Sequence, residues 1–260
     1  AETHDLSKLR MLASTGSVLV PESFDYIYES VKKDVHVASM SGGTDICGCF
    51  VASIPTLPVY RGELQGPCLG MATAVFDAQG KVAGKDEKGE LVCTVPFPSK
   101  PIGFWGDKEN EKYLSAYFEG FPGVWTHGDF ASVSETGGFT LYGRSDATLN
   151  SKGVRIGTAE IYRVVETFPQ IQESMAVSQD WDNDTRVVLF VVVKEGQAFD
   201  DEVAKEVKKA LRDQASPRHV PDKIIVAPEL PRTKSNKLVE LAVTDVINGR
   251  EVRNRDALAN

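Results

Sequence analysis

The sequence has few of the residues that build metal centres and disulfide frameworks. Its 260 residues include four histidines and four cysteines, which are Cys47, Cys49, Cys68 and Cys93. No two cysteines have the C-x-x-C spacing and no histidine cluster accompanies them. This pattern favours reduced thiols over a zinc site or a set of disulfides, and it is typical of the reducing cytoplasm.

Long apolar runs and a positive charge balance are also missing. No stretch reaches the roughly 18 apolar residues of a membrane-spanning helix. The formal net charge is −8 and the pI is about 5.1, which disfavours a general nucleic-acid surface without excluding a local anion site. The hydrophobic fraction of 42% is ordinary for a globular protein with a sizeable core. We therefore expect neither nucleic acid nor a membrane as a partner.

The most informative stretch is residues 141–157, LYGRSDATLNSKGVRIG. It reads as two short strands joined by a polar turn at residues 150–153, and it contains the cations Arg144, Lys152 and Arg155. Arginine presents a bidentate fork that suits phosphate or carboxylate. Spacing alone leaves an ordinary exposed hairpin as an equal alternative.

Four motifs together favour a ligand-binding site over an ordinary exposed hairpin. They are SGGTD at residues 41–45, WTHGD at 125–129, GRSD followed by NSKGVRIG within 143–157, and PRTKSNK at 231–237. In this order and rough spacing, they resemble the adenylate-forming acyl-CoA synthetases, and within that family the members that activate acetoacetate. The resemblance covers almost the whole chain.

The resemblance implies a fold of mixed α/β and α+β class. Residues 1–144 would be the C-terminal part of the large nucleotide- and acyl-binding domain, with a β-rich subdomain. Residues 145–260 would be the small mobile C-terminal domain, an α+β unit with a three-stranded sheet. Its strongest patterns are an apolar strand at 185–194 and an amphipathic helix at 200–214. The family's Lys-closed phosphate loop is missing, so we expect a C-terminal fragment of a longer enzyme, inactive alone.

The motifs of the first part imply a nucleotide site. Nucleotide contacts are expected from Gly42, Gly43, Thr44, Asp129, Arg144 and Arg155. Paired glycines let a backbone pass close to a ligand, and a carboxylate suits a ribose diol. Asp45 would help to hold Mg²⁺, directly or through water, because magnesium prefers oxygen ligands. Without the resemblance, residues 42–45 read as a turn. For His127 a structural role is favoured over that of a catalytic base.

The motifs of the second part imply the reaction chemistry. Lys237 is expected to be catalytic and to reach the reacting carboxylate and the phosphates. Asn236 replaces the glycine of the family motif, and asparagine tolerates the left-handed region well. Asp146 matches the hinge residue of the family, and Gly153 and Arg212 match CoA contacts. Acylation of the catalytic lysine would remove its charge and is an expected form of regulation.

The implied function is an AMP-forming ligase that uses ATP, Mg²⁺ and CoA to activate acetoacetate or a similar short acid. In acetyl-CoA synthetases a tryptophan occupies the position of Gly42, so we expect a roomier pocket, with acetoacetate preferred to butyrate and either to acetate. Gly42→Trp would then depress the use of acetoacetate selectively. Two alternatives stay open: an adenylation domain that loads a carrier protein, and a non-catalytic nucleotide-binding fragment.

Overall fold

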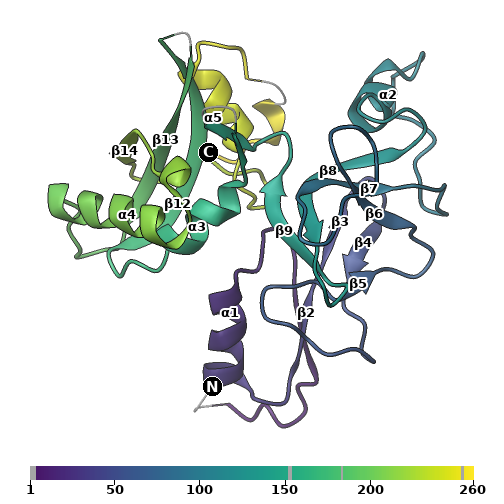
Figure 1. Ribbon diagram of the computed structural model, residues 1–260, viewed down its shortest axis with the longest axis horizontal. Helices are drawn as coiled ribbons and strands as arrows, with labels where there is room; N and C mark the ends of the chain where they lie inside the picture. Colours follow the sequence, from purple (N-terminus) through teal and green to yellow (C-terminus); the bar gives the residue numbers. More distant parts are fainter. Residues whose placement is uncertain (1–3, 152–153, 183, 253–254) are drawn as a thin grey trace. The chain divides into compact units, whose positions relative to one another are not determined.

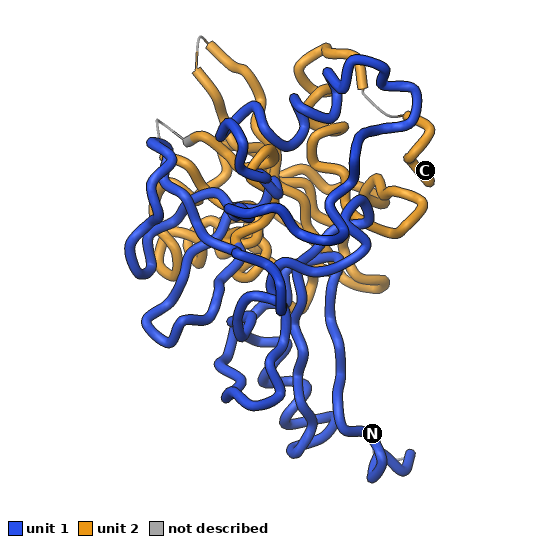
Figure 2. Tube along the Cα trace, turned by 90° about the vertical axis from the view of Figure 1, so that its right-hand side faces the viewer, with its two compact units in different colours: residues 1–141 blue, residues 142–260 orange. Residues whose placement is uncertain are grey.

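The computed structural model describes most of the chain (Figure 1). The described ranges are 4–151, 154–182, 184–252 and 255–260. The chain forms two compact units, residues 1–141 and 142–260 (Figure 2). No helix in the described ranges is both long and apolar enough to cross a membrane.

Unit 1 begins with a small parallel pair of strands covered by a helix. Strand β1 (Met11–Ser14) pairs with β2 (His36–Ser39), and α1 (Pro21–Tyr26) continues as the π-helical turn η1 (Ile27–Val31). Pro21 begins α1, where a backbone N–H would have no partner within the helix, so the missing N–H of proline costs nothing. The apolar stripe from Phe24 to Val31 at helical spacing predicts an amphipathic helix over residues 21–31. The burial of Phe24 and Ile27 in the local core confirms this prediction.

Two antiparallel sheets form the rest of unit 1. The first has the order β3 (Ser41–Gly43), β4 (Gly48–Ala52) and β5 (Gly66–Pro67). The second has the order β6 (Thr73–Phe76), β7 (Gly89–Cys93), β8 (Trp125–Val133) and β9 (Phe139–Arg144). Residues 71–76 and 89–95 are short alternating runs bounded by glycine and proline, a pattern that predicts antiparallel strands. The antiparallel pairing of β6 with β7 confirms this prediction.

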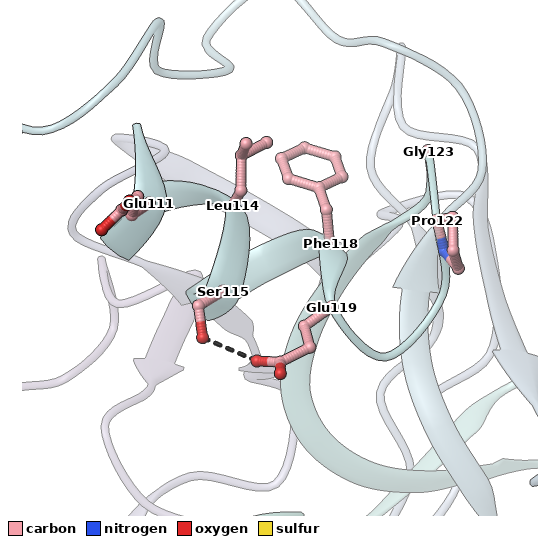
Figure 3. A pocket seen from close by; sticks show the side chains of 7 residues that line it. All are labelled: Glu111, Leu114, Ser115, Phe118, Glu119, Pro122 and Gly123. Atoms are coloured by element: carbon pink, nitrogen blue, oxygen red, sulfur yellow. Dashed lines mark hydrogen bonds between the residues drawn. The ribbon is translucent and has the colours of Figure 1, made fainter. Parts of the chain in front are cut away.

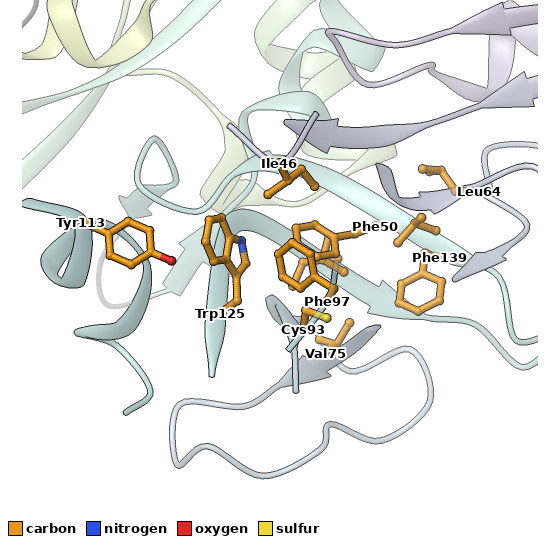
Figure 4. Close-up of a cluster of buried hydrophobic side chains, with 12 residues drawn as sticks. Ile46, Phe50, Leu64, Val75, Cys93, Phe97, Tyr113, Trp125 and Phe139 are labelled. Carbon is orange, nitrogen blue, oxygen red and sulfur yellow. The ribbon is translucent and has the colours of Figure 1, made fainter. Parts of the chain in front are cut away.

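An aromatic core joins these sheets to helix α2 (Glu111–Phe118) (Figure 4). Phe50 and Phe97 pack edge to face with their ring centroids 5.2 Å apart, and Trp125 lies beside both. The outward side of α2 carries a shallow apolar groove (Figure 3), whose lining residues are Glu111, Leu114, Ser115, Phe118, Glu119, Pro122 and Gly123. This groove contains none of the predicted site residues.

Unit 2 is built on a three-stranded sheet. Strand β12 (Ile171–Trp181) pairs antiparallel with β13 (Asp184–Val193), which pairs parallel with β14 (Lys223–Val226). The remaining elements are the hairpin β10 (Leu149–Ser151) and β11 (Val154–Ile156), α3 (Thr158–Val165), α4 (Asp201–Gln214), η2 (Pro217–His219), α5 (Glu240–Ile247) and η3 (Arg255–Ala257). The three-stranded sheet expected from the resemblance is confirmed.

Helices cover both faces of this sheet, as Figure 1 shows. Side chains alternate along β13: Leu189 faces α3 and α4, whereas Val188 belongs to the cluster with α5. Asp200 caps α4 by accepting hydrogen bonds from two amides of its first turn, each 3.0 Å long. Threonine is a favourable N-cap residue, so the sequence predicts that Thr158 caps α3. This prediction is wrong, because Gly157 is the N-cap and its amide donates to the Glu160 carboxylate over 2.9 Å.

The buried sheet makes a prediction for stability. Leu189→Ala is expected to destabilise unit 2 by about 2–5 kcal/mol, because Leu189 is 0% exposed and its truncation leaves a cavity. Urea unfolding followed by the fluorescence of Trp181, which lies on β12 and stacks on Arg186, measures this change. Val226→Ala on β14, where the side chain is 53% exposed, is the control and should shift stability by less than about 1 kcal/mol. Equal losses in both variants would contradict the assignment of the core.

Candidate active site

The glycine-rich strand β3 lies tightly against β4. Gly42 pairs with Cys49 and Gly43 pairs with Gly48. A Cβ atom on Gly42 would overlap the carbonyl oxygen of Gly48 and lie 2.6 Å from the Cα of Cys49. A side chain at this position would therefore point into the backbone of β4.

This geometry corrects the role predicted for Gly42 in substrate choice, whereas the preference for acetoacetate stays a prediction. The prediction for Gly42 took it as an opening left by a missing indole, so that Gly42→Trp would refill a pocket. The structure shows instead that Gly42 is required for the pairing of β3 with β4. The substitution would force the two strands apart, so it does not test substrate choice. A nucleotide contact of the Gly42 backbone stays a prediction.

The turn after β3 presents Thr44 and Asp45 at the surface. The Asp45 carboxylate accepts a hydrogen bond from the Tyr117 hydroxyl on α2. The Tyr117 ring in turn stacks on Trp125, with centroids 3.7 Å apart and planes 14° from parallel. Ile46, which is buried, anchors the other end of the turn. The position of Asp45 is thus fixed by an aromatic side chain from another element.

Asp129 is hydrogen-bonded to Ser41, the first residue of β3. The Ser41 hydroxyl donates to the Asp129 carboxylate over 2.7 Å. His127, two residues earlier on β8, is buried, and its Nε2 lies 3.1 Å from the carbonyl oxygen of Gly42. Its ring also packs edge-on against Phe50, with centroids 4.6 Å apart. These contacts suit the structural role expected for His127, and they bring the SGGTD and WTHGD motifs together.

The side chains near Asp45 limit how a Mg²⁺ ion could be held. Among the residues that the structure describes, no group of three or more His, Cys, Asp or Glu side chains could hold a metal ion. Magnesium is commonly held by one or two carboxylates together with substrate phosphates and water. The exposed carboxylate of Asp45 fits an ion held in that way.

In unit 2, Arg144 and Arg155 of the stretch 141–157 contact the chain itself. Arg144 forms an ion pair with Asp146, with Nη2 and Oδ2 3.1 Å apart, and the two side chains are 49% and 46% exposed. Arg155 donates to the carbonyl oxygen of Ser145 over 2.7 Å and to the hydroxyl of Thr148 over 2.8 Å. An exposed ion pair is worth little and is easily exchanged for a ligand. Arg155, in contrast, closes the loop between β9 and β10.

The predicted hairpin in this stretch is present. Strands β10 and β11 pair antiparallel, with Asn150 opposite Arg155. Two residues of the expected turn, Lys152 and Gly153, lie outside the described residues, so the CoA contact predicted for Gly153 has no structural counterpart to describe. Arg212 is exposed on α4, beside the buried Leu211. Its CoA contact also stays a prediction.

The PRTKSNK motif forms a tight turn with Lys237 at its end. The Thr233 amide donates to the Lys237 carbonyl oxygen over 2.8 Å, and the Asn236 amide donates to that of Thr233 over 2.8 Å. Asn236 has φ of 65°, which is the left-handed conformation expected when asparagine replaces glycine. The Lys237 side chain is exposed. The turn therefore presents a cation on a backbone of defined shape.

Sequence reasoning missed the partners that hold these groups. Ser41 opens the SGGTD motif, but nothing in the sequence shows that it bonds to Asp129. Tyr117 follows Tyr113 at helical spacing, which predicts an inward face of the helix but not the hydrogen bond to Asp45. Both partners come from segments far away in the chain.

Comparison with known proteins agrees with this arrangement. Residues 160–237 match the family described as AMP-binding enzyme C-terminal domain. The acetoacetyl-coenzyme A synthetase of Rhizobium meliloti (strain 1021) is 55% identical over 260 residues, which are 100% of this chain and 40% of that protein. The acetoacetyl-CoA synthetase of Gallus gallus is 44% identical over 261 residues, covering 100% of this chain and 39% of that protein.

Solved structures give the same picture. The acetoacetyl-CoA synthetase from Streptomyces lividans matches with a TM-score of 0.88 and 40% identity, over 98% of this chain and 39% of that one. An anthranilate CoA ligase matches at 20% identity with a TM-score of 0.81, which shows the fold alone. The chain spans about 40% of the length of the Rhizobium meliloti and Gallus gallus proteins. The resemblance to adenylate-forming acyl-CoA synthetases is thereby confirmed, and over its whole length this chain is similar to the acetoacetyl-CoA synthetases.

Proposed function

We propose that this chain is part of an AMP-forming ligase that joins acetoacetate to CoA. The observation that carries the proposal is the 55% identity, along the entire chain, to an acetoacetyl-coenzyme A synthetase. Residues 1–144 would supply part of the nucleotide- and acyl-binding domain, and residues 145–260 the mobile C-terminal domain, in a cytoplasmic enzyme.

In the first step, a carboxylate oxygen of the acid attacks the α-phosphorus of ATP. The bond between the α-phosphorus and the oxygen that bridges to the β-phosphate breaks. Acyl-AMP forms and pyrophosphate leaves. Asp129 accepts hydrogen bonds from the ribose hydroxyls, with its orientation fixed by Ser41. Gly42, Gly43 and Thr44 place backbone and hydroxyl groups along the nucleotide. When Mg²⁺ is bound, it neutralises phosphate charge, and Asp45 would hold it.

Cations of unit 2 complete the first step. Lys237 reaches the reacting carboxylate and the phosphates and stabilises the charge that develops there. Arg144 exchanges its exposed partner Asp146 for a ribose or phosphate oxygen. Arg155 is proposed as a further phosphate contact. Acylation of Lys237 would abolish its charge and thereby regulate this step.

In the second step, the CoA sulfur attacks the acyl carbon, and the bond from that carbon to the AMP oxygen breaks. Asp146 is the proposed hinge for the change between the steps. Gly153 would line the path of the pantetheine arm. Arg212, exposed on α4, would meet a phosphate of CoA.

The proposal predicts an order of substrates. Pyrophosphate exchange by the full-length protein that contains this chain is expected to be fastest with acetoacetate, slower with butyrate and slowest with acetate. A site with a hydrogen-bond donor for the keto oxygen rejects an analogue that leaves the donor unpaired. AMP production with CoA or with a carrier protein as acceptor separates a CoA ligase from a carrier-loading enzyme. Preference for acetate, or transfer only to the carrier, would contradict the proposal.

A further inference from the structure

The side chain of Arg232 ties the turn that carries Lys237 to the sheet. Arg232, which is partly buried, forms an ion pair through Nη2 with the Glu173 carboxylate on β12. Its Nη1 donates to the carbonyl oxygen of Asn236 over 2.9 Å. We propose that Arg232 is a positioning residue that holds Lys237 in place for the adenylation step. The inference rests on the proposed function for the role of Lys237.

The geometry requires both arms of a guanidinium. One arm points to a carboxylate on the sheet and the other to a backbone oxygen in the turn, and a planar fork holds both at once. A lysine ammonium, a point charge on a flexible stem, does not fix the two directions together. Glu173 follows an irregularity in the pairing of β12 with β13, and such irregularities re-aim side chains.

The two sides of the turn are held by different means. On the side of Lys234, the bonds run to the C-terminal segment: the Lys234 amide donates to the Ala257 carbonyl over 2.9 Å, and the Ala259 amide donates to that of Arg232 over 2.8 Å. The Arg232 amide also donates to the Asn260 side-chain oxygen over 2.8 Å. None of these bonds uses the Arg232 guanidinium. On the other side, the Arg232 guanidinium donates to the carbonyl of Asn236, the residue directly before Lys237. The Lys237 amide donates to the Thr233 hydroxyl over 3.1 Å. Loss of the guanidinium should thus loosen one side of the turn selectively.

Motion of the backbone on this side of the turn would displace Lys237, because its side chain is exposed. Its reach is determined by the backbone that carries it, since neighbouring side chains do not enclose an exposed group. A displacement of about 1 Å at a catalytic group lowers rates by up to roughly 10²-fold.

Hydrogen exchange of the 260-residue chain tests the structural part. In Arg232→Gln, the amides of Asn236 and Lys237 should exchange several-fold faster, whereas the amide of Lys234 should change little. Arg232→Lys should resemble Arg232→Gln, because one ammonium cannot make both contacts. The matched control is Arg250→Gln, which removes an arginine from the ion pair with Asp180 in the same unit, at 3.2 Å. An unchanged urea midpoint shows that the variants remain folded.

The functional part uses the full-length protein. Arg232→Gln should lower kcat for pyrophosphate release by roughly 10- to 100-fold, with thioester formation from added acyl-AMP nearly unchanged. Unchanged exchange at Asn236 and Lys237, or equal losses in both half-reactions, would overturn the positioning role. If the wild type shows no acetoacetate-dependent pyrophosphate release, the proposed function fails. The role of Arg232 in positioning Lys237 for adenylation then fails with it. The hydrogen-exchange comparison still decides whether Arg232 holds the turn.

Discussion

Lys237→Ala is expected to slow acyl-AMP formation by roughly 10²–10³-fold and to leave thioester formation from added acyl-AMP nearly unchanged. The reason is electrostatic. Charge moves onto the α-phosphate and pyrophosphate oxygens in the first step, and a cation placed there in advance stabilises the transition state. In the second step AMP leaves and the pyrophosphate is already gone, so the same cation has less to stabilise.

The turn offers a matched control in Lys234. Both lysines are exposed and lie on the same turn, so Lys234→Ala removes the same charge from the same surface. It should leave pyrophosphate release within severalfold of the wild type. The two half-reactions of the full-length protein are measured separately, one as pyrophosphate release and the other as thioester formation from acyl-AMP. Equal losses in both, or an equal effect of Lys234→Ala, would show that Lys237 is not specific to adenylation.

Gly42→Ala is expected to destabilise unit 1 by about 1–3 kcal/mol, the usual effect of overpacking a tight site. The added methyl group would overlap the Gly48 carbonyl oxygen, and the nearest atoms belong to a backbone that cannot rotate away. Urea unfolding in a Trp181→Phe background measures the change, because the remaining tryptophans, Trp105 and Trp125, both lie in unit 1.

Gly48→Ala is the control on the partner strand. A Cβ at Gly48 meets only the carbonyl oxygen of Ile46, at an ordinary contact distance of 3.6 Å. This variant should be close to neutral or slightly stabilising, because alanine has less freedom than glycine in the unfolded chain. If both alanines have the same effect, the close approach of β4 to Gly42 does not determine the stability of this hairpin.

Local patterns predicted the elements of unit 2 well. The apolar run at 185–194 is strand β13, and the stripe of Val203, Val207 and Leu211 is the inner face of α4. Both signals depend on residues close in the chain, so periodicity finds them. The left-handed conformation of Asn236 was likewise predictable from its residue type and position in the motif.

Contacts between distant segments were not predictable in this way. The direction of a side chain at Gly42 depends on the register between β3 and β4, which no local pattern determines. The bond from Tyr117 to Asp45 joins residues 72 positions apart. The choice of Gly157 over Thr158 as the cap of α3 shows the same limit at a helix end, where boundaries shift by one or two residues.

The topology of the sheet in unit 2 has a consequence for the order in which it assembles. Strands β12 and β13 are neighbours in the chain and pair along nearly their whole length. Strand β14 joins β13 in parallel only after the chain has passed through α4. Closing the longer loop costs more entropy, so contacts at small sequence separation form sooner. We expect the antiparallel ribbon to form early in folding, and β14 with the following segment that carries Lys237 to dock late.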